Sequence, residues 1–289
     1  MLNRLFSRTT SDDASQTQLP SPFSGSAQQA VNSDPQAAKA DLQTLAPTIA
    51  ILGAKGGCGA TTVAINLAAA LAARSLITLV DGNLHLPTIA HTLGQVPPHS
   101  LLELVTQGTK VDEHLFQACA ATVGAAGALR FLSPPMDGSA TARTNLTELA
   151  QTLKNIRSYS NLWVFDLPNT LDRHLVTTLD DCSKIILVFE ATVAGVAACR
   201  RWLEDFQELG YDKERVVCVL NRSGSKFKAV EDQIDSVFHD REVFRLPNAY
   251  QLIWQSTTEA VPAVLLQPNH AFSRAVTKLS DVLVASFKE

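Results

Sequence analysis

Short apolar runs alternate with longer helical stretches between residues 47 and 287. The apolar runs are five to seven residues long and rich in β-branched side chains, which is typical of buried strands. They predict strands at Thr48–Leu52, Leu76–Asp81, Leu129–Ser133, Leu162–Asp166, Lys184–Glu190 and Arg215–Asn221. The stretches between them predict helices at Thr61–Arg74, Pro98–Lys110, Val111–Ala120, Asn145–Arg157, Thr192–Leu209, Lys226–Phe238 and Phe272–Phe287. Strands that alternate with helices favour right-handed crossovers, so we expect an α/β fold with a mostly parallel, twisted sheet and helices on both faces.

The first part of the chain lacks this alternation. Residues 9–46 are rich in Ser, Thr, Gln, Asp, Ala and Pro, and Phe23 is their single aromatic residue. Such a segment cannot bury enough apolar surface to offset the entropy of ordering it. We therefore expect a disordered linker over residues 9–46 and one folded domain over residues 47–289.

Residues 1–8 differ from the linker in carrying several large apolar side chains. Met1, Leu2, Leu5 and Phe6 share one face of a helical projection, which predicts a small amphipathic tip. Such a tip fits a helix that docks on a membrane surface or a partner. It equally fits a frayed chain end, because an isolated helix of this length is marginal in water.

Composition limits the classes of function. A chain of 289 residues with 46% hydrophobic content can bury one sizeable core, and its net charge of -4 argues against a dedicated nucleic-acid binder. The five cysteines are scattered without a CxxC pair, so reduced thiols fit better than a zinc or iron–sulfur site. No apolar run reaches the ~20 residues that span a bilayer, and the first residues lack a secretory apolar core. We expect a cytoplasmic protein.

A glycine-rich loop, GAKGGCGATT, occupies residues 53–62 between a predicted strand and a predicted helix. In the common phosphate-binding loop, backbone N–H groups cradle phosphates, a lysine reaches the β- and γ-phosphates, and a hydroxyl group coordinates Mg²⁺. Here Thr61 supplies the hydroxyl group, Ala60 occupies the lysine position, and Lys55 lies near the start of the loop. The helix dipole adds a positive end that favours phosphate. The expected nucleotide contacts come from Gly56, Gly57, Cys58, Gly59, Ala60, Thr61 and Thr62.

Two predicted strands end in aspartates, Asp81 and Asp166. In a parallel sheet both carboxylates face the crevice that holds the loop. Because Mg²⁺ is commonly held by the loop hydroxyl group and a strand-end aspartate, we expect Thr61 and Asp166 to bind the metal, with Asp81 as second choice. For either aspartate the alternative is a turn or capping role.

Four segments together resemble the MinD/ParA group of deviant Walker P-loop ATPases. They are KGGCGATT at Lys55–Thr62, VDGNLHLPTIAHTLG at Val80–Gly94, FDLPNTLD at Phe165–Asp172 and VLNRSG at Val219–Gly224. Within that group, GATT, DLPNTL and VLNRSGSK resemble the CpaE/TadZ branch, which positions the Flp (tight-adherence) pilus machine. The resemblance spans residues 47–287 and implies a P-loop NTPase fold, ATP and Mg²⁺ as ligands, and an ATP-dependent homodimer. That branch commonly carries a receiver-like domain before the ATPase domain, where this chain has the expected linker.

The resemblance also implies roles for individual residues. Lys55 corresponds to the signature lysine that reaches across the dimer to the partner's phosphates. Asn221 corresponds to the residue that reads the adenine edge, although a strand-end turn role is its alternative. LPNAY, which begins with Leu246 and Pro247, resembles the proline segment beside the adenine.

Two departures from the family pattern concern hydrolysis. Lys55, Asp81 and Asn83 occupy the positions of catalytic side chains, but active relatives carry an acid where this chain has Asn83. An amide can hold a water molecule but cannot accept its proton as a carboxylate does. Ala60 removes the lysine that neutralises phosphate charge, although the CpaE/TadZ branch shares this alanine.

Three functions follow. The first is an ATP-binding, nucleotide-dependent dimerising protein that positions or assembles a pilus or secretion machine, with weak or no hydrolysis. The second is an active ATPase of the septum-site or chromosome-partition class. The third is a pseudo-ATPase scaffold. Peripheral contact with the inner face of the cell membrane or a pole is compatible with all three, and no nucleic-acid partner is expected.

The thiol of Cys58 offers a further hypothesis, that oxidation interferes with nucleotide binding. This hypothesis requires that Lys55 and the helix end lower the pKa of the thiol.

Overall fold

The computed structural model describes residues 45–124, 127–136, 145–224 and 228–287. The chain divides into two units, Met1–Leu45 and Ala46–Glu289, and the second unit contains every described helix and strand. The predicted tip at residues 1–8 and nearly all of the predicted linker lie outside the described residues. No helix in the described part of the chain is long and apolar enough to span a membrane.

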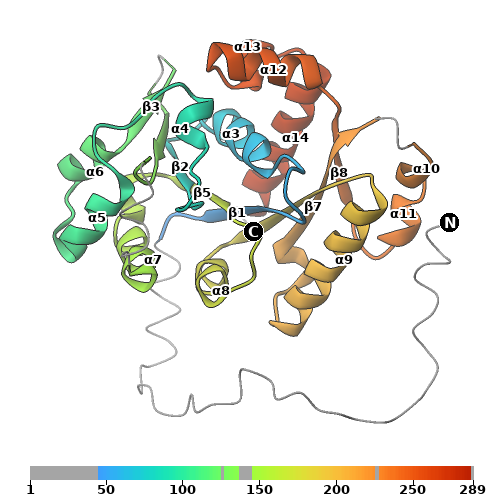
Figure 1. Ribbon diagram of the computed structural model, residues 1–289, viewed down its shortest axis with the longest axis horizontal. Helices are drawn as coiled ribbons and strands as arrows, with labels where there is room; N and C mark the ends of the chain where they lie inside the picture. The colour runs from blue at the N-terminus through green and yellow to red at the C-terminus, as the bar shows by residue number, and fades with distance from the viewer. Residues whose placement is uncertain (1–44, 125–126, 137–144, 225–227, 288–289) are drawn as a thin grey trace, which may run out of the picture. The chain divides into compact units, whose positions relative to one another are not determined.

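A single sheet forms the centre of the second unit (Figure 1). In the described ranges its eight strands lie in the order β3-β4-β2-β5-β1-β6-β7-β8. All neighbouring strands are parallel except β3 and β4, so the predicted mostly parallel sheet is confirmed. The strands are β1 (Thr48–Gly53), β2 (Ile77–Asp81), β3 (Ala121–Val123), β4 (Leu129–Leu132), β5 (Leu162–Leu167), β6 (Lys184–Glu190), β7 (Val216–Ser223) and β8 (Val243–Pro247).

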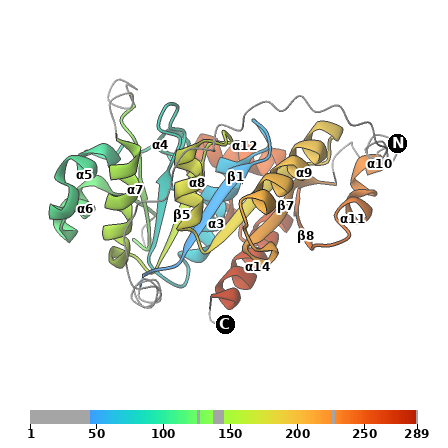
Figure 2. The ribbon, with the colours of Figure 1, turned by 90° about the horizontal axis from the view of Figure 1, so that it is seen from below.

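Helices cover both faces of the sheet (Figures 1 and 2). Helices α3 and α14 pack together on one face, and α8 and α9 lie on the other. The α-helices are α3 (Ala60–Leu71), α4 (Ile89–Thr92), α5 (Leu101–Gln107), α6 (Glu113–Cys119), α7 (Leu146–Asn155), α8 (Arg173–Asp180), α9 (Val193–Glu208), α10 (Lys228–Glu231), α11 (Ile234–Val237), α12 (Tyr250–Glu259), α13 (Ala263–Leu266) and α14 (Ala271–Ser286). Short 3-10 turns lie at Gly108–Lys110, Arg157–Tyr159 and Lys213–Arg215.

The central strands are buried on both faces. All residues of β1 and β2 are buried, and β5 is buried except at Leu167. Helices cover both sides, so successive side chains are apolar instead of alternating with polar ones. The two charged residues of these strands, Asp81 and Asp166, lie at the carboxyl end of the sheet, where the loop after β1 also lies.

The six strands predicted from the sequence are all present, with small shifts at their ends. In the described part of the chain, two strands and four helices lie in segments without a predicted element, namely β3, β8, α4, α8, α12 and α13.

The prediction of one continuous helix over Lys226–Phe238 is wrong. Within its described part the chain forms α10 and α11, separated by a turn. The Glu231 carboxylate at the end of α10 accepts hydrogen bonds from the Ser223 hydroxyl group and the Gly224 N–H. Beyond the turn, the Phe238 ring packs on Phe189, with centroids 5.3 Å apart. These two tertiary anchors hold the segment on either side of the break and override its local helical pattern.

Candidate functional site

The loop between β1 and α3 is held by hydrogen bonds from three other elements. The Ala54 N–H donates to the Val188 carbonyl of β6 (2.8 Å), and the Trp202 indole of α9 donates to the Ala54 carbonyl (3.2 Å). The Asn221 amide of β7 donates to the Cys58 carbonyl (2.9 Å). The loop is therefore fixed by the protein itself, so a ligand need not order it.

Gly57 and Gly59 of the loop differ in the space around them, although both are left-handed. Gly59 has a left-handed φ of 91°, and a Cβ added to it would lie 2.4 Å from Nδ2 of Asn221. Gly57 is also left-handed (φ 77°), but a Cβ there would meet nothing within 4 Å. Gly56 and Gly57 are exposed. Packing thus requires glycine at position 59, whereas the tip of the loop leaves open space for a ligand.

Helix α3 begins at this loop without a side-chain cap. Its N-cap residue, Gly59, makes no side-chain cap hydrogen bond to the first turn, and that turn contains no acidic residue. An uncapped helix start presents N–H groups and the positive end of the helix dipole, which favours an anion. Ala60, the first helical residue, is partly exposed and adds no charge. The arrangement fits a phosphate held mainly by the backbone.

Thr61 and Asp166, the two predicted metal ligands, are in direct contact. The Thr61 hydroxyl group donates to Oδ2 of Asp166 over 2.7 Å. Asp166 is only 4% exposed. Burial raises the pKa of its carboxyl group to about 7, and the nearby Asp81 charge adds to this rise, while the Thr61 hydrogen bond opposes it. This hard oxygen pair suits Mg²⁺, which takes its other ligands from phosphates and water. In the described ranges no cluster of three or more His, Cys, Asp or Glu side chains offers a competing metal site.

Asp81 holds the backbone of the segment that follows β2. Its buried carboxylate accepts hydrogen bonds from the N–H groups of Asn83 (3.1 Å), Thr88 (2.8 Å) and Ile89 (2.9 Å). Burial raises the pKa of this carboxyl group, whereas the three hydrogen bonds lower it. Asp81 is paired in register with Asp166 across β2 and β5. The contacts observed match the turn role that the sequence left open, and the metal and catalytic roles of Asp81 stay predictions.

Asn83 closes a small turn in the same segment. Its side-chain oxygen accepts a hydrogen bond from the Leu86 N–H over 3.3 Å. An amide oxygen in this position supports the backbone and offers no carboxylate to a water molecule. The catalytic position of Asn83 stays a prediction.

Lys55 is paired within its own chain. Its Nζ lies 3.1 Å from Oε2 of Glu190, at the carboxyl end of β6, and Glu190 also pairs with Arg222. One third of the Lys55 side chain is exposed, at 33%. Partly exposed pairs contribute roughly 0 to 1 kcal/mol, so releasing Lys55 toward another molecule is inexpensive.

The residues predicted to lie beside a base come from neighbouring strands β7 and β8. Asn221 donates to the loop carbonyl, and its Oδ1 accepts a hydrogen bond from the Arg222 N–H (3.0 Å). Leu246 is fully buried in the core, while Pro247 is partly exposed and pairs in register with Ser223. Asn221 therefore holds the loop, and contact of Asn221, Leu246 and Pro247 with a base stays a prediction.

The oxidation hypothesis for Cys58 is wrong in its premise. The thiol is 1% exposed and donates to the Val188 carbonyl at 3.2 Å. Burial raises the pKa of the thiol and outweighs the opposing effects of the backbone hydrogen bonds and Lys55. Glycine at position 53 makes room for the inward thiol, since a Cβ there would lie 2.5 Å from the sulfur atom.

Two residues that support the loop were not selected from the sequence. Glu190 ends the apolar run KIILVFE, in the same way that Asp81 and Asp166 end theirs, and this shared signal could have found it. Trp202 lies within α9, far from the loop in sequence, and no local pattern marks its contact with Ala54.

Comparison with solved structures identifies the fold. The ParA family ATPase of Chlorobium tepidum aligns with a TM-score of 0.74 at 16% identity, over 81% of this chain and 98% of that one. The septum site-determining protein MinD of Pyrococcus horikoshii, complexed with Mg-ADP, aligns with a TM-score of 0.69 at 21% identity, over 85% and 99% of the two chains. A Cyanothece McdA variant in complex with ATP aligns with a TM-score of 0.62 at 18% identity, over 81% and 96%.

No protein-family model matches the sequence, and no curated protein matches it by sequence. The structural likeness extends over nearly the whole length of each solved chain and includes the eight-stranded, mostly parallel sheet. The chain has the α/β P-loop fold of the ParA and MinD ATPases.

Proposed function

We propose that this chain binds ATP with Mg²⁺ on the loop at residues 53–62. The observation that carries the proposal is the 2.7 Å contact between Thr61 and Asp166, beside an uncapped helix start and an open glycine turn. Two structures with the same fold contain nucleotide, Mg-ADP in one and ATP in the other, which supports the assignment of ligand. The backbone, Thr61 and Asp166 hold the phosphates and metal, with no lysine at position 60.

Bound ATP, in this proposal, favours a homodimer in which Lys55 leaves Glu190 and reaches the partner's phosphates. The ion pair between Lys55 and Glu190 is partly exposed, so its loss costs little compared with contact to a buried triphosphate. The protein positions or assembles a pilus or secretion machine, as its resemblance to the CpaE/TadZ branch suggests. Residues 1–8 provide a peripheral membrane contact in the same proposal.

Hydrolysis in this proposal is weak or absent. The segment after Asp81 offers the Asn83 amide, whose oxygen is already engaged with the Leu86 N–H. Ala60 and Asn83 together favour a second candidate, a pseudo-ATPase scaffold that keeps the fold without using nucleotide. An active ATPase of the septum-site or partition class would require another base.

Equilibrium binding of a fluorescent ATP analogue, with and without Mg²⁺, tests the binding step. We expect Mg²⁺-dependent binding that weakens at least ~10-fold in Thr61→Ala, because the metal loses a ligand. Thr277→Ala, which removes a hydroxyl group of α14 bonded to the Ser273 carbonyl, serves as the matched control. Absence of binding to the wild type would favour the scaffold.

Light scattering of the same samples tests dimerisation. We expect ATP with Mg²⁺ to double the mass of the wild type and to leave Lys55→Ala monomeric while it still binds ATP. Lys184→Ala is the matched control, since the Lys184 ammonium group at the start of β6 donates to the Glu214 carbonyl over 2.9 Å. Dimerisation of Lys55→Ala equal to that of the wild type would reject the role of Lys55 across the dimer.

A further inference from the structure

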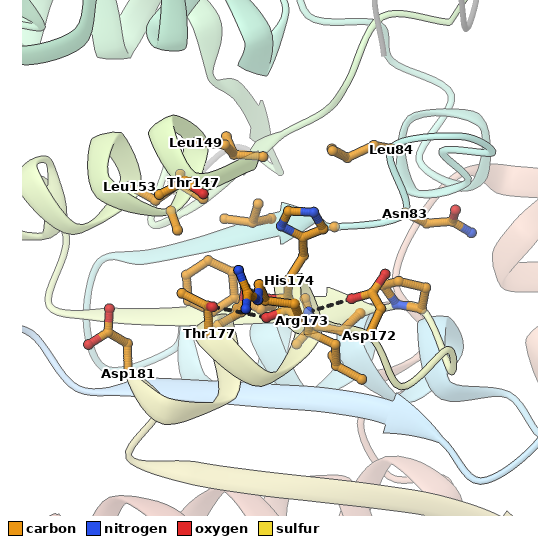
Figure 3. A pocket seen from close by; sticks show the side chains of 18 of the residues that line it. Asn83, Leu84, Thr147, Leu149, Leu153, Asp172, Arg173, His174, Thr177 and Asp181 are labelled. Atoms are coloured by element: carbon orange, nitrogen blue, oxygen red, sulfur yellow. Dashed lines mark hydrogen bonds between the residues drawn. The ribbon is translucent and has the colours of Figure 1, made fainter. Parts of the chain in front are cut away.

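A cavity of about 530 Å³ lies beside the candidate nucleotide site, between α7, α8 and the carboxyl ends of β2 and β5 (Figure 3). No residue of the loop at residues 53–62 lines it. Its volume falls in the range of about 300 to 1,000 Å³ that holds small molecules. In Figure 3 the His174 ring projects from α8 toward Leu149 of α7 and Leu84 of the segment after β2. The cavity is thus distinct from the phosphate-binding loop.

The inner wall of the cavity is apolar. Val80 and Phe165 contribute from the ends of two buried strands, and Leu149 and Leu153 contribute from α7. A wall of this kind accepts an apolar ring or chain, because burying that surface is favourable. The cavity extends inward to Val80 and Phe165 of the sheet, so it suits a small molecule better than a partner helix that would lie across the surface.

A buried cation also lines the cavity. Arg157 is 5% exposed, its Nη2 donates to the Asp181 carbonyl at 3.0 Å, and its Nε has no hydrogen-bond partner in the described structure. Leaving a buried polar group of a cation without a partner is unfavourable, so an anion in the adjoining cavity would be a favourable neighbour for this charge. The guanidinium group presents planar donors that suit a carboxylate, sulfonate or phosphate.

Counting Arg157, the charged groups among the described residues of the lining are three cations and two carboxylates, which leaves one excess positive charge. Lys154 and Arg173 are cationic, and the two carboxylates are already engaged. Asp172 accepts a hydrogen bond from the Leu175 N–H at 2.8 Å, and Asp181 pairs with Lys154 at 3.2 Å. An anion therefore meets more positive than negative charge here.

We propose that this cavity binds a small organic anion with an apolar body, and that its occupancy is coupled to nucleotide. Its walls include Gly82–His85, which follows Asp81, and Asp172–Leu175, which lies a few residues after Asp166. A ligand in the cavity touches both segments, so a change in their position on nucleotide binding changes its affinity. The coupling rests on the proposed function, whereas binding of the anion does not.

Fluorescence titration of the full-length protein with anilinonaphthalene sulfonate, an aromatic anion, tests the site. We expect one saturable site that binds the neutral analogue phenylnaphthylamine at least ~10-fold more weakly, because the neutral compound cannot pair with Arg157. Arg157→Gln should weaken binding of the sulfonate by a similar factor and leave the neutral analogue unchanged. Equal binding of both compounds to the wild type would overturn the proposal.

A second variant keeps the site testable if Arg157→Gln does not fold. Ala150 lines the cavity from α7, so Ala150→Phe should fill it and abolish sulfonate binding. Ala285→Phe, on an exposed position of α14, is the matched control and should bind like the wild type. Trp254→Ala tests the exposed aromatic side chains of α12, where Trp254 is 64% exposed, and should also bind like the wild type. Unchanged binding in Ala150→Phe, or loss in Trp254→Ala, would place the probe elsewhere and reject the site.

Coupling is measured by repeating the titration with ATP and Mg²⁺ at saturation, as judged by separate ATP binding. A change of at least ~3-fold in sulfonate affinity supports coupling. If ATP binds and the affinity is unchanged, the coupling is rejected while the site stands. If ATP does not bind, the proposed function fails independently of the anion titration.

Discussion

The loop at residues 53–62 and the segment at residues 82–87 face the same end of the sheet but depend on the sequence in different ways. The loop lacks the usual lysine, yet its shape is fixed by bonds from β6, β7 and α9 to its backbone. The segment after Asp81 is also well anchored, by three N–H groups on one carboxylate. At position 83, however, this segment has an asparagine in place of the acid that the family resemblance leads us to expect. Binding through backbone groups tolerates the loss of a side chain, whereas proton transfer depends on the identity of a side chain.

A change in the backbone conformation of the loop should have the largest effect on ATP affinity. Gly59→Ala would place a Cβ 2.4 Å from Asn221 Nδ2 at a left-handed φ, so the loop must shift. We expect ATP affinity to fall by about 100-fold, or roughly 2.7 kcal/mol, in equilibrium binding. Gly210→Ala is the matched control, because Gly210 is also left-handed (φ 79°) but open and distant from the loop in sequence. An affinity for Gly59→Ala close to that of the control would show that loop shape is not limiting.

A pH titration of the free energy of unfolding tests the raised pKa of Asp166. The pKa of its carboxyl group is raised by burial from 3.8 to about 7, so the native state holds a proton that the unfolded state has released over this range. The free energy of unfolding should therefore fall by about 1.4 kcal/mol per pH unit between pH 4 and 7, with no further fall from this group above pH 7. The difference between the wild type and Asp166→Asn in urea unfolding isolates this effect. A difference that does not change with pH would contradict the raised pKa.

Restoring the missing lysine tests how much of the free energy of phosphate binding comes from the loop backbone. Ala60→Lys should tighten ATP binding by about 10-fold, since one charge-assisted contact to the β- and γ-phosphates contributes about 1.5 kcal/mol. Ala60→Gln has a similar length without the charge and should bind like the wild type. A gain of 1,000-fold or more, on the order of 4 kcal/mol, would mean that the backbone alone binds poorly.

How far the sequence predicts this site differs between its parts. The placement of Thr61 and Asp166 near each other was predictable because each follows a local signal, a glycine loop before a helix and an apolar run that ends in an acid. Their binding of a metal stays a prediction. The support of the loop by Trp202 and the pairing of Lys55 with Glu190 depend on long-range packing that no local pattern encodes. Strand β8 was missed because VFRLP is short and interrupted by an arginine, although pairing with β7 makes it a strand.

The smallest effect is expected at Cys58, whose thiol faces inward. Cys58→Ser should change ATP affinity by less than about 2-fold, because a serine hydroxyl group can also donate to the Val188 carbonyl. A thiol reagent should leave Cys58 unlabelled in the native protein, as found by mass spectrometry of peptides, and label it after unfolding in urea. Rapid native labelling of Cys58, with loss of ATP binding, would revive the oxidation hypothesis.

ATP binding and single-turnover hydrolysis, measured in the same samples of wild type and Asn83→Asp, show whether nucleotide binding and catalysis are separate in this protein. We expect the wild type to bind ATP with Mg²⁺ but to hydrolyse it no faster than Thr61→Ala. We expect Asn83→Asp to bind ATP within about 3-fold of the wild type and to hydrolyse it at least ~10-fold faster, because a carboxylate is restored for the attacking water. Hydrolysis by the wild type at the rate of Asn83→Asp would contradict the separation of binding from catalysis.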